Sequence, residues 1–295
     1  MDEALAVPDG PAAFDGLSSQ PPSWQAAATL ASDVDTSLVL PLYGERAAVL
    51  GVSWAGCAGA AYAARRESAE AGETDAFSPS SLPRRRMYDR VVVLTRGGAD
   101  AATLGAIEHL RDHAILTTVV TASAASPAAD LAGHLLVIGD ESADGRGDGG
   151  GGRGGDGDAV FALTALALLR ANLHEDLRTA IADGATALAG DAPDVGASAV
   201  VLGDGWTRGI ACHAATTLRA GGVAATARPA AELERAEAAM LGPGTTVWAF
   251  ADVASAVRDG AIAAGATWRR ATLDPMAELL LVARAAAGAS TRRRG

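Results

Sequence analysis

Lysine is absent from this sequence: all 24 basic residues are arginine, 35 residues are acidic, and the net charge is -11. Without a lysine amine, Schiff-base chemistry is excluded. The acidic balance argues against nucleic acid and anionic membrane surfaces as partners, because both favour cationic protein faces. Two cysteines, Cys57 and Cys212, are too few for a disulfide framework and are typical of a reducing compartment.

Targeting and metal-binding signals are also scarce. The opening Met-Asp-Glu has neither the basic residues nor the apolar run of a signal peptide, and no apolar stretch reaches the roughly 18 uncharged residues of a membrane span. We therefore expect a soluble, cytoplasmic protein without membrane contact. His109 and His113 lie four residues apart without a third ligand in view, so we expect exposed histidines, no metal and no cofactor.

Small apolar side chains, by contrast, are abundant. Apolar residues make up 49% of the chain and aromatic residues only 4%. Short Val/Leu/Ile runs alternate with Ala-rich helical stretches, which predicts an α/β fold of mainly parallel sheets flanked by helices in three αβα layers. The predicted strands span 46–53, 90–95, 115–121, 134–139, 199–202, 245–250 and 267–273, and the predicted helices span 20–31, 56–71, 100–113, 127–131, 159–182, 207–220, 252–264 and 275–287.

An internal repeat indicates two related domains. The segment 49–57 recurs as 201–209, and in each copy an apolar run ends in a Gly-x-small-Trp turn before an Ala-rich stretch. We predict a first domain over 1–158, which carries an N-terminal helix and a glycine-rich insert at 143–158, and a second over 159–295, which starts with a connecting helix. The insert cannot bury apolar surface, so it is predicted to be a disordered loop.

Three glycine-containing turns are candidate ligand sites. They lie at 53–56, 95–100 and 203–208, where strands are predicted to end and helices to begin. Ligands of open parallel sheets bind beyond the carboxyl ends of the strands, and helix N-termini favour anions there. Any one of these turns is a weak signal, because every α/β protein has several.

The turn at 95–100 has the best chemistry for an anion. Thr95 and the amides of Gly97 and Gly98 can donate hydrogen bonds to a phosphate, and Arg96 can bind it with two parallel hydrogen bonds. Asp100 argues against an anion at the helix N-terminus, and we predict that it caps the helix instead.

Several segments of the chain, in their order, resemble motifs of one family. Residues 94–104 (Leu-Thr-Arg-Gly-Gly-Ala-Asp-Ala-Ala-Thr-Leu) resemble a phosphate loop Ile-Ser-x-Ser-Gly-Glu-Thr-x-x-Thr-Leu, and 51–56 lie where that family has Gly-x-Gly-Thr-Ser. Residues 126–132 and 229–233 resemble its Ser-Pro-Leu-Ala and Pro-Ala-Gly-Glu-Leu segments. The family is that of tandem sugar isomerase (SIS) domains, including the isomerase half of glucosamine–fructose-6-phosphate aminotransferase (isomerizing). This resemblance implies two SIS domains, a phosphosugar ligand and a homodimer.

Catalytic residues of the family are missing from the matching positions. The glutamate that transfers the proton would fall near Ala220, and the histidine that opens the sugar ring would fall at Arg235. In the phosphate loop only Thr95 keeps a hydroxyl. Isomerisation needs a general base and an acid, and loss of a base costs about 10²–10⁴ in rate. The departures therefore predict impaired catalysis.

Three functions follow from these residues. The first is a phosphosugar-binding protein with impaired catalysis, its site formed by Ser53, Thr95, Arg96, Gly97 and Gly98. The second is an active phosphosugar aldose–ketose isomerase or aminosugar-phosphate isomerase/deaminase, with a relocated base. The third is a structural paralogue without a ligand.

The second function has only two candidate bases. They are Glu232 and Glu234, in an acidic segment of the second half. Whether the protein is an enzyme stays open at this point.

Overall fold

A computed structural model of the protein describes residues 16–139 and 155–292. The chain divides into two compact units. The described part of the first unit is 19–139 with 157–181. That of the second is 182–292, with which 16–18 and 155–156 are grouped. The long helix that follows the glycine-rich insert thus groups largely with the first sheet.

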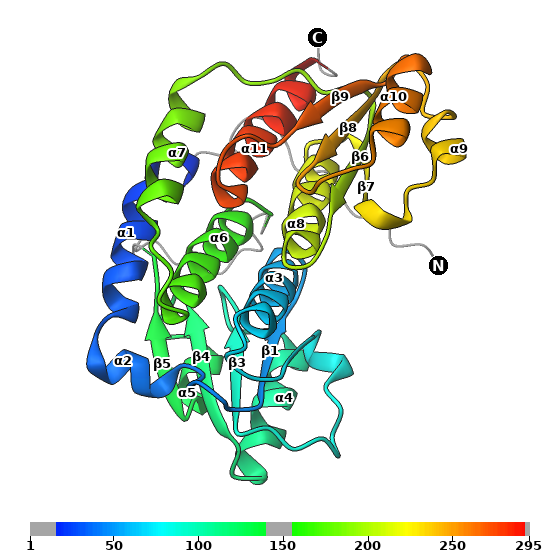
Figure 1. The fold of residues 1–295 in the computed structure, drawn as a ribbon. Helices are drawn as coiled ribbons and strands as arrows, with labels where there is room; N and C mark the ends of the chain where they lie inside the picture. The colour runs from blue at the N-terminus through cyan, green and yellow to red at the C-terminus, as the bar shows by residue number, and fades with distance from the viewer. Residues whose placement is uncertain (1–15, 140–154, 293–295) are drawn as a thin grey trace. The chain divides into compact units, whose positions relative to one another are not determined.

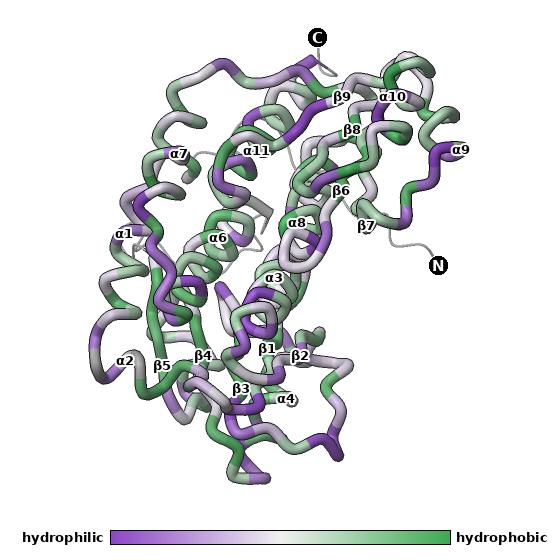
Figure 2. Tube along the Cα trace, viewed as in Figure 1, coloured by the Kyte–Doolittle hydropathy of each residue, from purple (hydrophilic) through white to green (hydrophobic). Residues whose placement is uncertain are grey.

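The first unit contains a parallel five-stranded sheet with the strand order β2-β1-β3-β4-β5. The central strands are buried over their whole length, because helices cover both faces of the sheet. Figure 2 shows the apolar character of β3 and β4 in green. The strands are β1 (Ala47–Gly51), β2 (Thr74–Phe77), β3 (Arg90–Leu94), β4 (Leu116–Thr121) and β5 (His134–Val137).

Successive side chains along a strand point to opposite faces of the sheet, and their contacts show which helices cover each face. Leu50 and Val91 pack in one core cluster with Ile107 of α4 (Ala101–Asp112). Val49 points to the opposite face, where α3 (Trp54–Ser68) approaches so closely that a Cβ on Gly59 would lie 2.9 Å from its side chain. The other helices of this unit are α1 (Gln20–Ala31), α2 (Val34–Val39), the 3-10 turn η2 (Pro79–Ser81), α5 (Pro127–Leu131), α6 (Gly155–Asn172) and the start of α7 (Arg178–Ala189).

The second unit repeats this topology with one strand fewer. Its parallel sheet has the order β7-β6-β8-β9, which matches β2-β1-β3-β4 of the first. The strands are β6 (Ser198–Gly203), β7 (Ala224–Pro229), β8 (Thr245–Ala249) and β9 (Thr267–Arg270), and the helices are α8 (Thr207–Ala220), η3 (Ala230–Glu232), α9 (Arg235–Ala238), α10 (Ser255–Ala263) and α11 (Pro275–Arg292). The predicted α/β fold with parallel sheets is confirmed.

The structure corrects three sequence-based predictions. The predicted helix 159–182 is two helices, α6 and α7. The edge strands β2 and β7 were not predicted, because neither contains a continuous apolar run. Most of the predicted disordered insert lies outside the described residues, but 155–158 are helical. The reason is that an aspartate such as Asp158 suits a helix N-terminus and the apolar residues behind it anchor α6 in the core.

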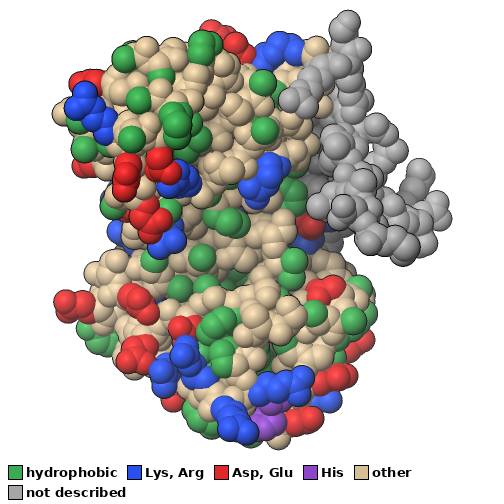
Figure 3. Space-filling view, turned by 90° about the vertical axis from the view of Figure 1, so that its right-hand side faces the viewer, with side chains coloured by type: hydrophobic (Ala, Val, Ile, Leu, Met, Phe, Trp, Pro, Cys, Tyr) green, Lys and Arg blue, Asp and Glu red, His purple; other side chains and the backbone are tan. Residues whose placement is uncertain are grey.

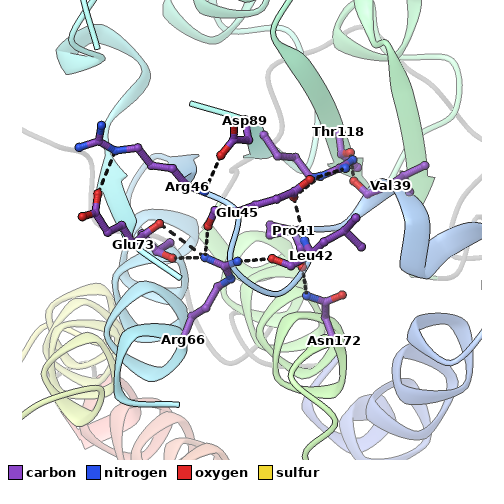
Figure 4. Close-up of polar contacts among 12 residues, drawn as sticks. Val39, Pro41, Leu42, Glu45, Arg46, Arg66, Glu73, Asp89, Thr118 and Asn172 are labelled. Carbon is purple, nitrogen blue, oxygen red and sulfur yellow. Dashed lines mark hydrogen bonds and ion pairs between the residues drawn. The ribbon is translucent and has the colours of Figure 1, made fainter. Parts of the chain in front are cut away.

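A buried arginine organises the chain where it enters the first sheet (Figure 4). Arg66, near the end of α3, has no exposed surface. Its guanidinium donates to the carbonyl oxygens of Glu45 (2.9 Å) and Leu42 and to the Thr74 hydroxyl (2.8 Å). One side chain therefore joins α3, β2 and the loop before β1.

Glu45 extends this cluster to the third strand. Its carboxylate accepts two hydrogen bonds from Arg90, at 2.9 and 3.1 Å, and one from the Leu42 N–H at 2.8 Å. Burial by itself would raise the pKa of this carboxyl, but the bonds from Arg90 and Leu42 outweigh it, and the pKa lies below its usual value. The cluster lies at the amino-terminal ends of the strands. Ligands of parallel sheets bind at the opposite, carboxyl-terminal ends.

Within the described ranges, no helix is long and apolar enough to cross a membrane. Acidic and arginine side chains lie interspersed on the face that Figure 3 presents.

Candidate functional site

The first unit has a cavity of about 330 Å³ at the carboxyl ends of β1 and β3. The chain leaves β1 toward β2 on one side, and β3 lies on the other, so this is the switch point at which open α/β sheets bind ligands. The cavity is lined by Val52, Ala55, Leu94, Thr95, Arg96, Gly97, Gly98, Ala99, Asp100, Thr103, Asp158 and Phe161. Four of the five predicted binding residues are in this set, and the fifth, Ser53, is next to Val52.

The loop between β3 and α4 is held in one conformation by its own hydrogen bonds. The Gly98 N–H donates to the Thr95 hydroxyl at 3.1 Å, and the Gly98 carbonyl accepts from the Ala128 N–H at 2.9 Å. Gly98 has a φ of 60°, and a Cβ there would lie 2.7 Å from the Ser126 hydroxyl. Glycine is therefore required at this position.

These bonds also decide which donors of the loop are available to a ligand. The Gly98 amide, which sequence analysis offered to a phosphate, is already used by Thr95. The Thr95 proton is left to donate, and the Gly97 N–H has no partner among the described residues. Thr95 is 8% exposed and lines the cavity.

Arg96 brings the positive charge. Its backbone carbonyl accepts from the Thr121 hydroxyl at 2.9 Å, which fixes the start of the side chain. The guanidinium lies against the first turn of α6, where a Cβ on Gly157 would be 2.2 Å from its central carbon. Among the described residues its charged partner is Asp158, with 4.0 Å between Nη1 and Oδ1. Within the described chain the guanidinium donates no hydrogen bond, so its donors are available to a ligand.

Asp100 caps α4, as the sequence predicted. Its Oδ1 accepts from the Thr103 N–H at 2.8 Å. The positive end of the helix dipole is therefore already matched by a carboxylate, and a second anion at that N-terminus would be repelled. An anion in this cavity must bind at Arg96 and Thr95 instead.

Ser53 occupies a strained turn between β1 and α3. Its φ of 54° and ψ of -125° are unusual for a residue with a side chain. The turn is tight: a Cβ on Gly51 would lie 2.6 Å from the backbone of Ala55. The Ser53 hydroxyl does not cap α3, and the residue is exposed.

The two candidate bases lie in the second unit. Glu232 ends η3 and is exposed. Glu234 is also exposed, and its N–H donates to the Glu237 carboxylate at 3.3 Å. The hydrogen bond from Arg228 to Glu237 lowers the pKa of that carboxyl. A catalytic role for Glu232 or Glu234 stays a prediction.

Asp158 and Phe161 are the site residues that sequence analysis missed. Both come from the start of α6, far along the chain from the loops that form the rest of the cavity. Asp158 was not singled out from the sequence, because it ends a glycine-rich segment that is predicted to be disordered. The available signal was its place directly before a long apolar helix.

The described residues contain no group of three or more His, Cys, Asp or Glu side chains arranged for a metal ion. His109 and His113 have ring centroids 4.2 Å apart, and His113 is exposed. Burial lowers the pKa of His109, and the charges of His113 and Arg84 add to the effect.

Solved structures with this fold include phosphosugar enzymes. A glucosamine-6-phosphate deaminase from Thermotoga maritima matches with a TM-score of 0.69 and 13% identity, over 94% of each chain. The C-terminal domain of a glucosamine-fructose-6-phosphate aminotransferase from Francisella tularensis has a TM-score of 0.67 and 14% identity, over 93% of this chain and 94% of that one. A tagatose-6-phosphate ketose/aldose isomerase from Escherichia coli has a TM-score of 0.64 and 15% identity, over 95% of this chain and 92% of that one.

No protein-family model and no curated protein matches the sequence. At these identities the likeness shows the fold, which spans nearly the whole length of each compared structure. The chain thus has the α/β fold of these compared structures.

Proposed function

We propose that this protein is a tandem SIS-domain protein that binds a phosphosugar, or a related carbohydrate derivative, in the cavity between β1 and β3. The observation that carries the proposal is the Arg96 guanidinium, which lies in a cavity at the switch point and donates no hydrogen bond to the described chain. Guanidinium groups bind phosphate with two parallel hydrogen bonds.

The rest of the cavity suits a sugar. Thr95 and the Gly97 amide supply donors beside Arg96, and the Asp158 carboxylate can accept from sugar hydroxyls. Phe161 and Leu94 offer apolar surface to the C–H groups of the ring. A volume near 330 Å³ is at the small end of the usual range of about 300–1,000 Å³ for ligand sites, as fits one monosaccharide.

Impaired catalysis is part of the proposal. By the resemblance, the family's base would fall near Ala220 and its ring-opening histidine at Arg235, and a methyl group cannot remove a proton. In the first-unit cavity Asp100 is engaged as a helix cap. We propose a sensor or accessory role in the cytoplasm, as a homodimer.

An active isomerase or deaminase is the second candidate. It is supported by the likeness to solved structures of a glucosamine-6-phosphate deaminase and a tagatose-6-phosphate isomerase. It requires a base such as Glu232 or Glu234. Turnover of a phosphosugar that disappears in Glu232→Gln or Glu234→Gln would favour this candidate over a binding protein.

Titration calorimetry with hexose 6-phosphates and the matching free hexoses tests the binding proposal. We expect binding of the phosphorylated sugars, and a loss of at least tenfold in affinity in Arg96→Ala, since a charged hydrogen-bonding pair is removed. Arg111→Ala is the matched control, because Arg111 is an exposed arginine of α4 that does not line the cavity. Equal affinity of both variants and the wild type would contradict the site assignment.

A further inference from the structure

Asp158 stands beside the cation on which the proposed function depends. It comes from the first turn of α6, and its Oδ1 lies 4.0 Å from Nη1 of Arg96. The two side chains are 46% and 48% exposed. At that distance and exposure the pair is held by long-range attraction, without a hydrogen bond between them.

A second arginine–carboxylate pair in the same unit shows what a closed pair looks like. Arg90 donates two hydrogen bonds to Glu45, at 2.9 and 3.1 Å, and its side chain is only 5% exposed. Arg96 has the same chemistry available, but Asp158 leaves its donors unused. The contact between Asp158 and Arg96 is therefore weaker than the contact between Glu45 and Arg90.

The charges that line the cavity sum to a negative value. One arginine, Arg96, stands with two carboxylates, Asp100 and Asp158, which gives 1 - 2 = -1. A phosphate bound at Arg96 lies within a few ångströms of Asp158, and at that separation two negative charges in partly exposed surroundings repel each other. The carboxylate thus opposes the same anion that the guanidinium attracts.

We propose that Asp158 is the residue that sets the cavity's selectivity between phosphorylated and neutral sugars: it neutralises Arg96 in the empty site and weakens the binding of any anion that displaces it. The inference rests on the proposed function, because it assumes that phosphate binds at Arg96. Gly157 positions Arg96 beside Asp158, because only a residue without Cβ lets the guanidinium lie across the first turn of α6.

The test compares Asp158→Asn with the wild type by titration calorimetry, using glucose 6-phosphate, inorganic phosphate and glucose. We expect Asp158→Asn to bind the two phosphates about three- to tenfold more tightly, with affinity for glucose unchanged within twofold. Asp130→Asn is the matched control, because Asp130 is also a first-turn aspartate of a helix but does not line the cavity. It should bind all three ligands like the wild type.

The outcomes distinguish the role of Asp158 from the proposed function. Glucose 6-phosphate binding that is equal or weaker in Asp158→Asn overturns the role of Asp158 and leaves the proposed function standing. Absence of phosphate binding in both the wild type and Asp158→Asn overturns both. The Asp158 carboxylate also interacts favourably with the helix dipole of α6, so the melting temperature of each ligand-free variant is recorded to detect a loss of stability. Gly157→Ala is a second variant that tests the role of Asp158. Its methyl group should push the guanidinium away from Asp158 and change the ratio of phosphate to glucose affinity without removing a charge.

Discussion

The two strand–helix turns of the internal repeat have the same backbone plan and different chemistry. In the first, Ser53 adopts a φ of 54° beside a cavity and leaves its hydroxyl without a cap contact. In the second, Gly205 takes the corresponding left-handed conformation with a φ of 52°. There the polar groups bond to one another: the Thr207 hydroxyl donates to the Asp204 carbonyl at 2.8 Å, and Asp204 accepts from the Ala230 N–H at 3.1 Å.

This difference shows how two sheets of the same topology can carry turns of different chemistry. Topology sets the position of a possible site at each switch point, since β1 and β6 occupy equivalent places in their sheets. Side chains then decide whether the turn offers donors to a ligand or uses them internally. The first turn has a serine in a strained conformation. The second has glycine at that position, and its polar groups are hydrogen-bonded within the protein.

The largest expected difference between the two copies concerns an arginine near the end of each equivalent helix. Arg66 is fully buried and holds three segments, whereas Arg219 of α8 is exposed and donates to the Ala225 carbonyl at 3.0 Å and to Thr216. We expect Arg66→Ala to lower the free energy of unfolding by about 3 kcal/mol and Arg219→Ala by less than about 1 kcal/mol. Urea unfolding of both variants measures this, and equal losses would contradict it.

The next prediction concerns the glycines that end β1 and β6. A Cβ on Gly51 would lie 2.6 Å from the backbone of Ala55, and one on Gly203 would lie 2.2 Å from the Thr207 carbonyl oxygen. Because backbone atoms cannot rotate away, Gly51→Ala and Gly203→Ala should each cost about 2 kcal/mol of stability. Thermal unfolding compares them with Gly97→Ala, where no atom lies within 4 Å. A near-neutral Gly203→Ala would show that the second turn is not built like the first.

Smaller changes in stability, of opposite sign in the two turns, are expected at Ser53 and Gly205, which both have a positive φ. Ser53→Gly should stabilise the protein by about 1 kcal/mol by relieving backbone strain, and Gly205→Ala should destabilise it by a similar amount. Ser53→Gly should also weaken phosphosugar binding if the hydroxyl contacts the ligand. Ser53→Ala separates the two effects, because it removes the hydroxyl and keeps the strain. Unchanged melting of Ser53→Gly would disprove the strain.

The smallest expected effect is on acid stability. The pKa of Glu45 is depressed in the folded state, so its contribution is present above the unfolded value near 4.5 and is lost as the pH falls through the folded value. We expect the stability difference between the wild type and Glu45→Gln to shrink as the pH is lowered from 6 to about 3. Urea midpoints across this range measure it, and a difference independent of pH would argue against the shift.

Much of the fold could be read from local patterns. The buried strands β1, β3, β6 and β8 contain continuous apolar runs, and the amide donors at helix starts are matched by recognisable caps such as Asp100. The edge strands β2 and β7 could not be predicted from sequence patterns, because half-exposed strands carry polar residues. These segments form strands because they pair with β1 and β6. The break between α6 and α7 also depends on packing that no local signal marks.

The sequence by itself determined the α/β class, the repeated strand–turn–helix plan and the loop that carries Thr95 and Arg96, because each depends on residues close together in the chain. Only the tertiary structure decided that Asp158 stands beside Arg96, that the Gly98 carbonyl accepts a hydrogen bond from the Ala128 N–H and that Arg66 is buried. Those facts depend on contacts between segments far apart in the sequence, and such contacts exist only once the sheet has assembled and its helices have packed.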